Sequence, residues 1–383
     1  MNQTAQRQNP WLRSGAWDVF WMLSGLWLLL PIAGFSGAPT ALKVMLIGAT
    51  ALLWLSHRFA TTYNAFCMPA YRQLLGEQRD RFVIWPAVII IATFAFVFLP
   101  ESVMRLNLWG RVQILATIFF LYNSYHFGIQ HYGVLSIYRI RAGQGHSGWL
   151  KRYEKFFAIA VGTIVVALAQ MCHGAEVVAD SLVYNVVPRE VFGVVFGVLQ
   201  KVAPLLMLGL AGIFYAGEFR NTLVSIPKVL YVGGLALQGI LAYFLEPISF
   251  LILWGVQHWL VSVALGAHMA DNDASEVPAG SWWYGMWARF NKGFWPTVFI
   301  LVLASIVLTP FFELAVHPYK VGWAPGVLST FGSMLGNSWA TKLFIALNFI
   351  SVYIHFVMDR AVFRFSDPAV RKISVPLLFK PVG

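Results

Sequence analysis

Six of the nine histidines in this 383-residue chain lie in or against strongly apolar segments. An ionisable side chain is costly inside a membrane, so each one requires a partner or a role. Imidazole nitrogen is also the commonest protein ligand for transition metals. The six histidines therefore predict a shared polar layer that binds metal. They are His57, His126, His131, His258, His268 and His355.

The densest polar motif runs from Tyr122 to Gly133. In a helix, His126 and Gln130 share a face because they are four residues apart. His131 follows His126 by five residues and points about 140° away from it. The motif predicts two metal ligands, His126 and His131, with Gln130 orienting a ligand or binding a cofactor or substrate oxygen. The alternative is a polar seam that joins helices through hydrogen bonds.

A second motif repeats the pairing of glutamine with histidine. Gln257 directly precedes His258, which lies near the middle of its apolar segment. We expect His258 to be a ligand, with Gln257 in the same supporting role as Gln130. His268 lies ten residues further on, about 15 Å along a helix, so the two histidines do not readily bind one ion together. A solvated histidine near the interface is the alternative for His268.

A third motif joins a histidine to a carboxylate. Asp359 follows His355 by four residues, so its oxygens can bind the same metal or orient the imidazole. The alternative is a surface pair between Asp359 and Arg360. His57 ends its apolar segment, where an interfacial cap is the alternative to a ligand. The full predicted ligand set is His126, His131, His258 and His355, then His57, His268 and Asp359.

The composition is that of a membrane protein with several spans. Hydrophobic residues make up 58% of the chain and charged residues 11%, and the mean hydropathy is +0.67. No soluble domain of this size has such a composition. The net charge of +11 is typical of basic cytoplasmic loops, so we expect no nucleic-acid partner. Motifs for nucleotide hydrolysis, zinc-dependent proteolysis and serine hydrolysis are absent.

The apolar segments predict an all-α transmembrane bundle of about ten helices. Residues 1–383 form one transmembrane domain, with a cytoplasmic segment at 1–15 and a cytoplasmic or membrane-surface tail at 363–383. The expected spans are 16–36, 40–60, 83–100, 107–135, 154–172, 191–216, 226–245, 248–270, 293–313 and 340–362.

The distribution of Lys and Arg predicts the orientation. Of the 27 basic residues, twenty fall on the side that carries both termini, six on the other side, and Lys201 within a segment. Cytoplasmic loops carry the excess of positive charge, so both termini are expected in the cytoplasm of a multi-pass inner-membrane protein. All six histidines then lie on segments that run from outside to inside.

The ligand types suit iron, as one ion or a di-iron pair, or else zinc or copper. A site in the cytoplasmic half of the bilayer can reach lipid-soluble substrates and take electrons from the cytoplasm. We therefore predict a metal-dependent oxidoreductase that acts on a lipid or other hydrophobic molecule. Basic residues near Arg139, Arg141, Lys151 and Arg152 are expected to hold an anionic headgroup or to dock an acidic electron donor.

This layout of histidines on four helices resembles the membrane fatty-acid desaturase and hydroxylase class, and loosely the membrane carotenoid-cleaving oxygenases. The resemblance implies a di-iron site near the cytoplasmic face. The HxxxH and HxxHH clusters of the desaturase class do not occur in this chain. The predicted ligands therefore come from their depth in the membrane and not from that resemblance.

Two other functions fit the same residues. Intramembrane histidines can relay protons in a proton-coupled or metal transporter, which predicts polar residues on both sides of the membrane midplane. Facing histidines can also hold haem in an electron carrier.

Overall fold

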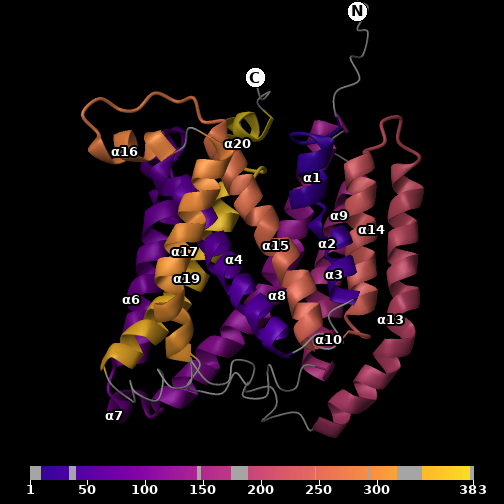
Figure 1. Ribbon diagram of the computed structural model, residues 1–383, viewed down its shortest axis with the longest axis horizontal. Coiled ribbons are helices and arrows are strands. Elements are labelled where there is room, and N and C mark those ends of the chain that lie inside the picture. The colour runs from indigo at the N-terminus through magenta and orange to yellow at the C-terminus, as the bar shows by residue number, and fades with distance from the viewer. Residues whose placement is uncertain are drawn as a thin grey trace, which may run out of the picture.

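The computed structural model describes residues 10–33, 40–144, 148–173, 189–245, 247–290, 293–316 and 339–379. Within these ranges all regular secondary structure is helical, which confirms the all-α part of the predicted fold. Helix lies within each of the ten predicted segments (Figure 1). The longer helices are α4 (Thr40–Cys67), α6 (Trp85–Phe98), α8 (Leu108–Arg141), α9 (Trp149–Ile159), α13 (Arg189–Glu218), α14 (Ile226–Leu241), α15 (Pro247–Asp271), α17 (Phe294–Val316), α19 (Trp339–Val362) and α20 (Pro368–Phe379).

Shorter elements complete or interrupt these helices. The first segment is divided into three helices, and two segments contain a π-helical stretch. These elements are α1 (Gly15–Trp21), α2 (Ser24–Trp27), α3 (Leu29–Ala33), η1 (Pro69–Tyr71), α5 (Arg72–Glu77), η2 (Asp80–Ile84), α7 (Glu101–Met104), η3 (Ala160–Val165), α10 (Val166–His173) and α16 (Trp282–Phe290).

Three helices in the described ranges are long and apolar enough to cross a membrane: Asp80–Phe98, Glu190–Glu218 and Trp339–Val362. Counting each of two bent helix pairs as one span raises this number to five. The first of these pairs joins Gly15–Trp21 to Ser24–Ile32 with a bend of 64°. The protein therefore has helices suited to a membrane, while ten crossings, the side of the termini and the particular membrane stay predictions.

The helices that carry the predicted ligands run in the same direction. Arg58 of α4 donates a hydrogen bond to Asn348 of α19, and Thr61 donates to Asp359, so residue numbers rise together along the pair. Other contacts among α4, α8, α15 and α19 follow the same order. They are His57–His258 and Asn64–Met269 for α4 with α15, and Leu115–Tyr353 and His126–Asp359 for α8 with α19.

Two glycines bring neighbouring helices unusually close. A Cβ atom added at Gly162 would lie 2.5 Å from the Cα atom of Gly128, so α8 and η3 touch backbone to backbone. A Cβ atom at Gly266 would lie 3.1 Å from that of Ala60, where α4 crosses α15. Small residues permit this approach in membrane helices, where close packing drives association.

One end of the molecule gathers α1, α16 and α20 (Figure 1). There α20 covers the end of α15 and buries Val370 and Leu378. The Asn272 side chain donates to the Leu377 carbonyl at 2.7 Å and so holds the last turn of α20. The predicted tail thus contains a helix with one face packed on protein, and its contact with a membrane surface stays a prediction.

A buried ion network joins α8, α9, α13 and α14. Glu154 of α9 accepts from Arg139 and lies 2.8 Å from the Lys228 Nζ atom, which is 2.6 Å from Glu218. The side chains of Glu154, Lys228 and Glu218 are fully buried. The guanidinium of Arg139 is buried and committed to this network, so it is not available for the expected contact with a headgroup or an electron donor. For Arg141, Lys151 and Arg152 that contact stays a prediction.

Candidate metal centre

Four of the six predicted histidines meet in the interior. The ring centroids of neighbouring imidazoles lie 4.5 to 5.2 Å apart, and each ring has two such neighbours. The four rings therefore form a closed square in which every corner comes from a different helix. In order around the square they are His57 (α4), His355 (α19), His126 (α8) and His258 (α15). Together with Asp359 we call them the histidine cluster.

The geometry of the cluster has the dimensions of a metal site. The Nε2 atoms of His126 and His355 are 3.1 Å apart. Two nitrogens bound to one ion at about 2.0–2.1 Å are separated by roughly 3.0–3.4 Å, depending on the angle between them. Asp359 adds a carboxylate whose Oδ2 atom lies 3.5 Å from the His126 Nε2 atom. These three side chains can therefore hold one ion without moving far.

Two overlapping groups of possible ligands occur among the described residues. One contains His57, His258 and His355, and the other contains His126, His355 and Asp359. Within each group the ligand atoms all lie within 4.8 Å of one another. His355 belongs to both groups, so it is the residue that links the two halves of the cluster.

Several ring nitrogens in the cluster have no hydrogen-bond partner in the described part of the chain. Both nitrogens of His258 and the Nδ1 atom of His355 are buried in this condition. The Nδ1 atom of His355 does lie 3.3 Å from Asp359, but without the geometry of a hydrogen bond. Buried polar atoms are nearly always satisfied in proteins, and in a membrane an unsatisfied one costs several kcal/mol. A bound ion would supply a partner for one of the two nitrogens of His258.

Neighbouring side chains fix the orientation of the ligands. The Nδ1–H group of His57 donates to the Trp54 carbonyl of its own helix, which leaves Nε2 free to bind an ion. Phe127 stacks on His258 with ring centroids 3.8 Å apart and an angle of 7° between the planes. The Thr61 hydroxyl donates to Asp359 Oδ1 at 2.6 Å. Such outer contacts are what holds metal ligands in productive positions.

His131 lies beside the cluster but outside both ligand groups. Its Nδ1 atom shares a hydrogen bond of 2.7 Å with the Tyr231 hydroxyl, and its ring centroid is 6.5 Å from that of His258. Gln130 reaches the cluster through the backbone, because its side-chain amide donates to the His258 carbonyl at 3.1 Å.

His268 and Gln257 point elsewhere. The Nε2–H group of His268 donates to the Leu378 carbonyl, so this imidazole helps to dock α20. The Gln257 side chain accepts from Gln238 at 2.6 Å, beside Gly25 of α2. Neither residue belongs to a ligand group in the described part of the chain, although both lie on α15 with His258.

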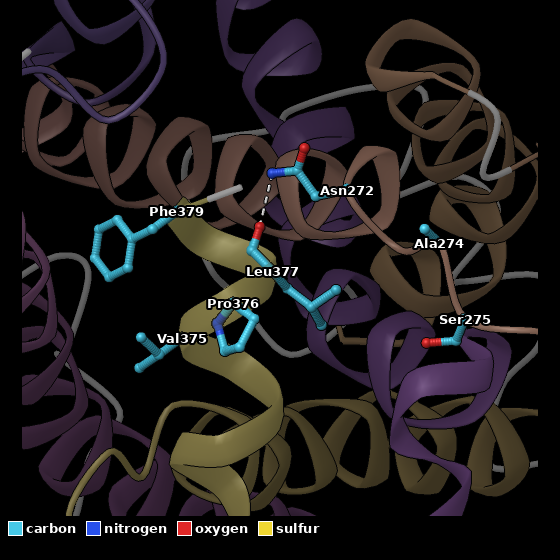
Figure 2. A pocket seen from close by; sticks show the side chains of 7 residues that line it. All are labelled: Asn272, Ala274, Ser275, Val375, Pro376, Leu377 and Phe379. Atoms are coloured by element: carbon cyan, nitrogen blue, oxygen red, sulfur yellow. Dashed lines mark hydrogen bonds between the residues drawn. The ribbon is translucent and has the colours of Figure 1, made fainter. Parts of the chain in front are cut away.

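One cleft lies away from the cluster. It has a volume of about 520 Å³ and lies between the end of α15 and α20 (Figure 2). Its lining includes Asn272, which is fourteen residues beyond His258 and therefore about 21 Å further along the helix. The ligand geometry, and not this cleft, is the guide to the chemistry.

Two supporting residues were not predicted from the sequence. Thr61 follows His57 by four residues and so lies on the same helix face. This spacing could have identified Thr61 as a neighbour of the predicted ligand. The stacking of Phe127 on His258 joins two helices, and no local pattern indicates it.

Comparison with protein-family models, with curated proteins and with solved structures gives no match to this chain, so geometry and chemistry alone carry the functional argument.

Proposed function

We propose that the protein is an integral membrane oxidoreductase that depends on a transition metal and acts on a lipid or other hydrophobic molecule. The observation that carries this proposal is the square of four imidazoles with one carboxylate, contributed by four helices. A polar seam that only joins helices would pair its nitrogens, whereas His258 has two unpaired ones in the described structure.

The donor set favours iron, as one ion or two, with zinc or copper as the other choices. Nitrogen-rich ligation with a single carboxylate suits these metals, while magnesium and calcium require mostly oxygen. Such a metal, when bound, supplies redox and Lewis-acid chemistry in a dry site. Haem would need two facing imidazole nitrogens far enough apart to admit the macrocycle, and the Nε2 atoms of His126 and His355 are only 3.1 Å apart, so haem is disfavoured.

The surroundings of the cluster favour an apolar substrate. Phe356 lies 4.7 Å from the ring of His126, and Tyr122 packs on Phe356 at 4.8 Å. On α8, the helix that carries Tyr122 and His126, the side chains of Leu121 and Tyr125 are exposed. In a membrane these exposed side chains would meet lipid, so a hydrophobic molecule can approach His126 along an aromatic wall. The reaction we propose is therefore hydroxylation or another oxygenation of such a molecule, or its desaturation.

Elemental analysis of the purified full-length protein tests the metal centre. We expect stoichiometric iron, zinc or copper in the wild type and its loss from His126→Ala, His258→Ala and His355→Ala. His268→Ala is the matched control, since it removes a buried imidazole outside the cluster, and it should keep the metal. Full retention of metal in all three cluster variants would refute the site.

Incubation with membrane lipids, dioxygen and a chemical reductant tests the reaction. Mass spectrometry should then show lipids that gain an oxygen atom or lose two hydrogens, and only with metal-loaded protein. A folded wild type without metal would instead favour transport, which solute flux in liposomes would reveal.

A further inference from the structure

Helix α16 lies across the bundle, whereas the long helices run along it. In Figure 1 it runs sideways at the end of the molecule that also contains α1 and α20. The axis of α16 and the axis of the following helix, Phe294–Leu308, differ by 109°. With α17 along the membrane normal, α16 is therefore nearly parallel to the membrane plane.

One face of α16 is fixed to the protein. The indole N–H group of Trp283 donates to the Phe66 carbonyl at 2.8 Å. The Trp287 ring packs edge-on against Tyr63, with ring centroids 5.4 Å apart. Phe66 and Tyr63 both belong to the last two turns of α4. These contacts hold α16 at a definite height on the bundle.

The neighbouring face of α16 is apolar and open. Trp282 is 73% exposed, Phe290 is exposed as well, and Met286 is partly exposed between them. These three residues are spaced four apart, so they follow one stripe of the helix. Arg289 is exposed and borders the stripe. An apolar aromatic face with a basic residue beside it is typical of helices that lie between lipid headgroups and acyl chains.

Other exposed tryptophans occur at the same end of the molecule. Trp295 is 66% exposed at the start of α17, and its ring lies 6.0 Å from that of Trp21 in α1. Trp85 is 57% exposed at the start of α6, four residues after Arg81, which pairs with Asp367 at the start of α20. Tryptophan rings prefer the headgroup level of a bilayer. The stripe on α16 therefore belongs to a belt whose partner is a lipid surface.

We propose that α16 is an interfacial helix that lies in the phospholipid headgroup layer. Its stripe of Trp282, Met286 and Phe290 inserts between the lipids, and the Arg289 guanidinium contacts lipid phosphate. Large apolar side chains gain free energy when they leave water, and this insertion supplies the burial that the protein itself does not. The pair of α16 and α17 is then a surface helix followed by a spanning one, and not a single bent span.

The position of α16 also sets the depth of the histidine cluster. Phe66, whose carbonyl holds Trp283, follows His57 by nine residues, which is about 10–14 Å of depth over the usual range of helix tilt. Half of the hydrocarbon core of a bilayer is about 15 Å thick. The cluster therefore lies among acyl chains of the leaflet that contains α16. This consequence rests on the proposed function for its meaning, which is that a lipid reacts at its chain and not at its headgroup.

Spin labels in the full-length protein measure the depth of α16. Trp282→Cys and Phe290→Cys are made without the two native cysteines, labelled, and placed in vesicles of phosphatidylethanolamine and phosphatidylglycerol. The ratio of label collisions with dioxygen to those with a water-soluble nickel chelate rises with depth in the bilayer. Glu276→Cys, exposed in the loop before α16, is the control for water, and Leu303→Cys, exposed on α17, is the control for hydrocarbon.

We expect the collision ratios at positions 282 and 290 to agree within about two-fold, to exceed the ratio at 276 by at least about three-fold, and to fall below the ratio at 303. Ratios at 282 and 290 as low as that at 276 would overturn the proposal, because the stripe would face water. A ratio at either position as high as that at 303 would also overturn it, because α16 would then be part of a span.

These outcomes are separate from those of the metal analysis. The depth of a label on α16 does not depend on bound metal, so a protein without metal can still support the interfacial helix. A protein that contains metal can equally refute it. The four replaced side chains are exposed, so the labelled variants should melt like the cysteine-free parent protein.

Discussion

The histidine cluster and the buried ion network lie in the same bundle but satisfy their polar groups differently. In the ion network each carboxylate contacts a cation, and Gln144 donates to Glu218 at 2.7 Å. In the histidine cluster the rings contact one another, and several nitrogens have no hydrogen-bond partner among the described residues.

This difference separates a structural region from a candidate site. Opposite charges that neutralise each other inside the protein need no ligand to compensate them. Removing one partner of such a pair leaves the other charge buried and unpaired. Imidazoles grouped at ligand distances lack such mutual compensation, and a bound ion would provide it. The ion network should therefore control stability, and the cluster should control metal binding.

The largest expected effect is the loss of stability when the ion network is broken. Glu154→Gln removes the carboxylate that Arg139 and Lys228 share, and breaking a buried pair costs about 3–5 kcal/mol. We expect a large fall in melting temperature, measured by tryptophan fluorescence in detergent. Glu77→Gln, at an exposed carboxylate that accepts from Gln73, is the control and should melt like the wild type. Similar melting of the two variants would contradict the structural role of the network.

An intermediate effect is expected at the outer contacts of the cluster. Thr61→Val keeps the shape of the side chain but removes the hydrogen bond to Asp359, which should weaken metal affinity about 10- to 100-fold. Competition with a chelator measures this affinity, and the melting temperature without metal should change little. Ser56→Ala is the control on the same helix, because Ser56 bonds to Ser305 away from the cluster. Equal affinities in both variants would remove Thr61 from the site.

The smallest effect is expected at the partly exposed ion pair of Arg81 and Asp367. The Arg81 guanidinium lowers the pKa of the Asp367 carboxyl, so the pair stabilises the fold above the unfolded pKa of about 3.9. That stability is lost as pH falls through the lower folded value. Exposed pairs contribute roughly 1 kcal/mol or less.

Asp367→Asn should therefore melt slightly below the wild type at pH 7, and the gap should close below about pH 4. Asn can still accept from the backbone at the start of α20, where Asp367 bonds to the N–H groups of Ala369 and Val370. A gap that does not narrow at all as the pH falls below about 4 would show that the charge is not the cause.

The sequence predicted the fold class and much of the candidate site because its signals are local. Apolar runs placed helix within the ten predicted segments, and the spacing of His355 and Asp359 placed both on one face. The shared direction of the four ligand helices followed from counting segments. It is confirmed because the contacts among α4, α8, α15 and α19 join residues whose numbers rise in the same direction.

Other expectations depended on which way a side chain points around its helix. His131 lies beside the cluster yet faces Tyr231, and His268, about 15 Å along α15 from His258, faces α20. Arg139 was expected to help hold a headgroup or an electron donor, but it pairs with Glu154, which lies on the buried face of α9. Rotation and tilt of helices are set by packing between distant segments, and no local pattern encodes them.

By itself, the sequence determined that the chain forms apolar helices with imidazoles at similar depths, because hydropathy and helical spacing are properties of short stretches. Only the tertiary structure decided which imidazoles share a site. Close contacts such as Gly266 against Ala60 set how the ligand helices approach each other, and a helix rotated by one residue, or about 100°, would turn its histidine away from the square.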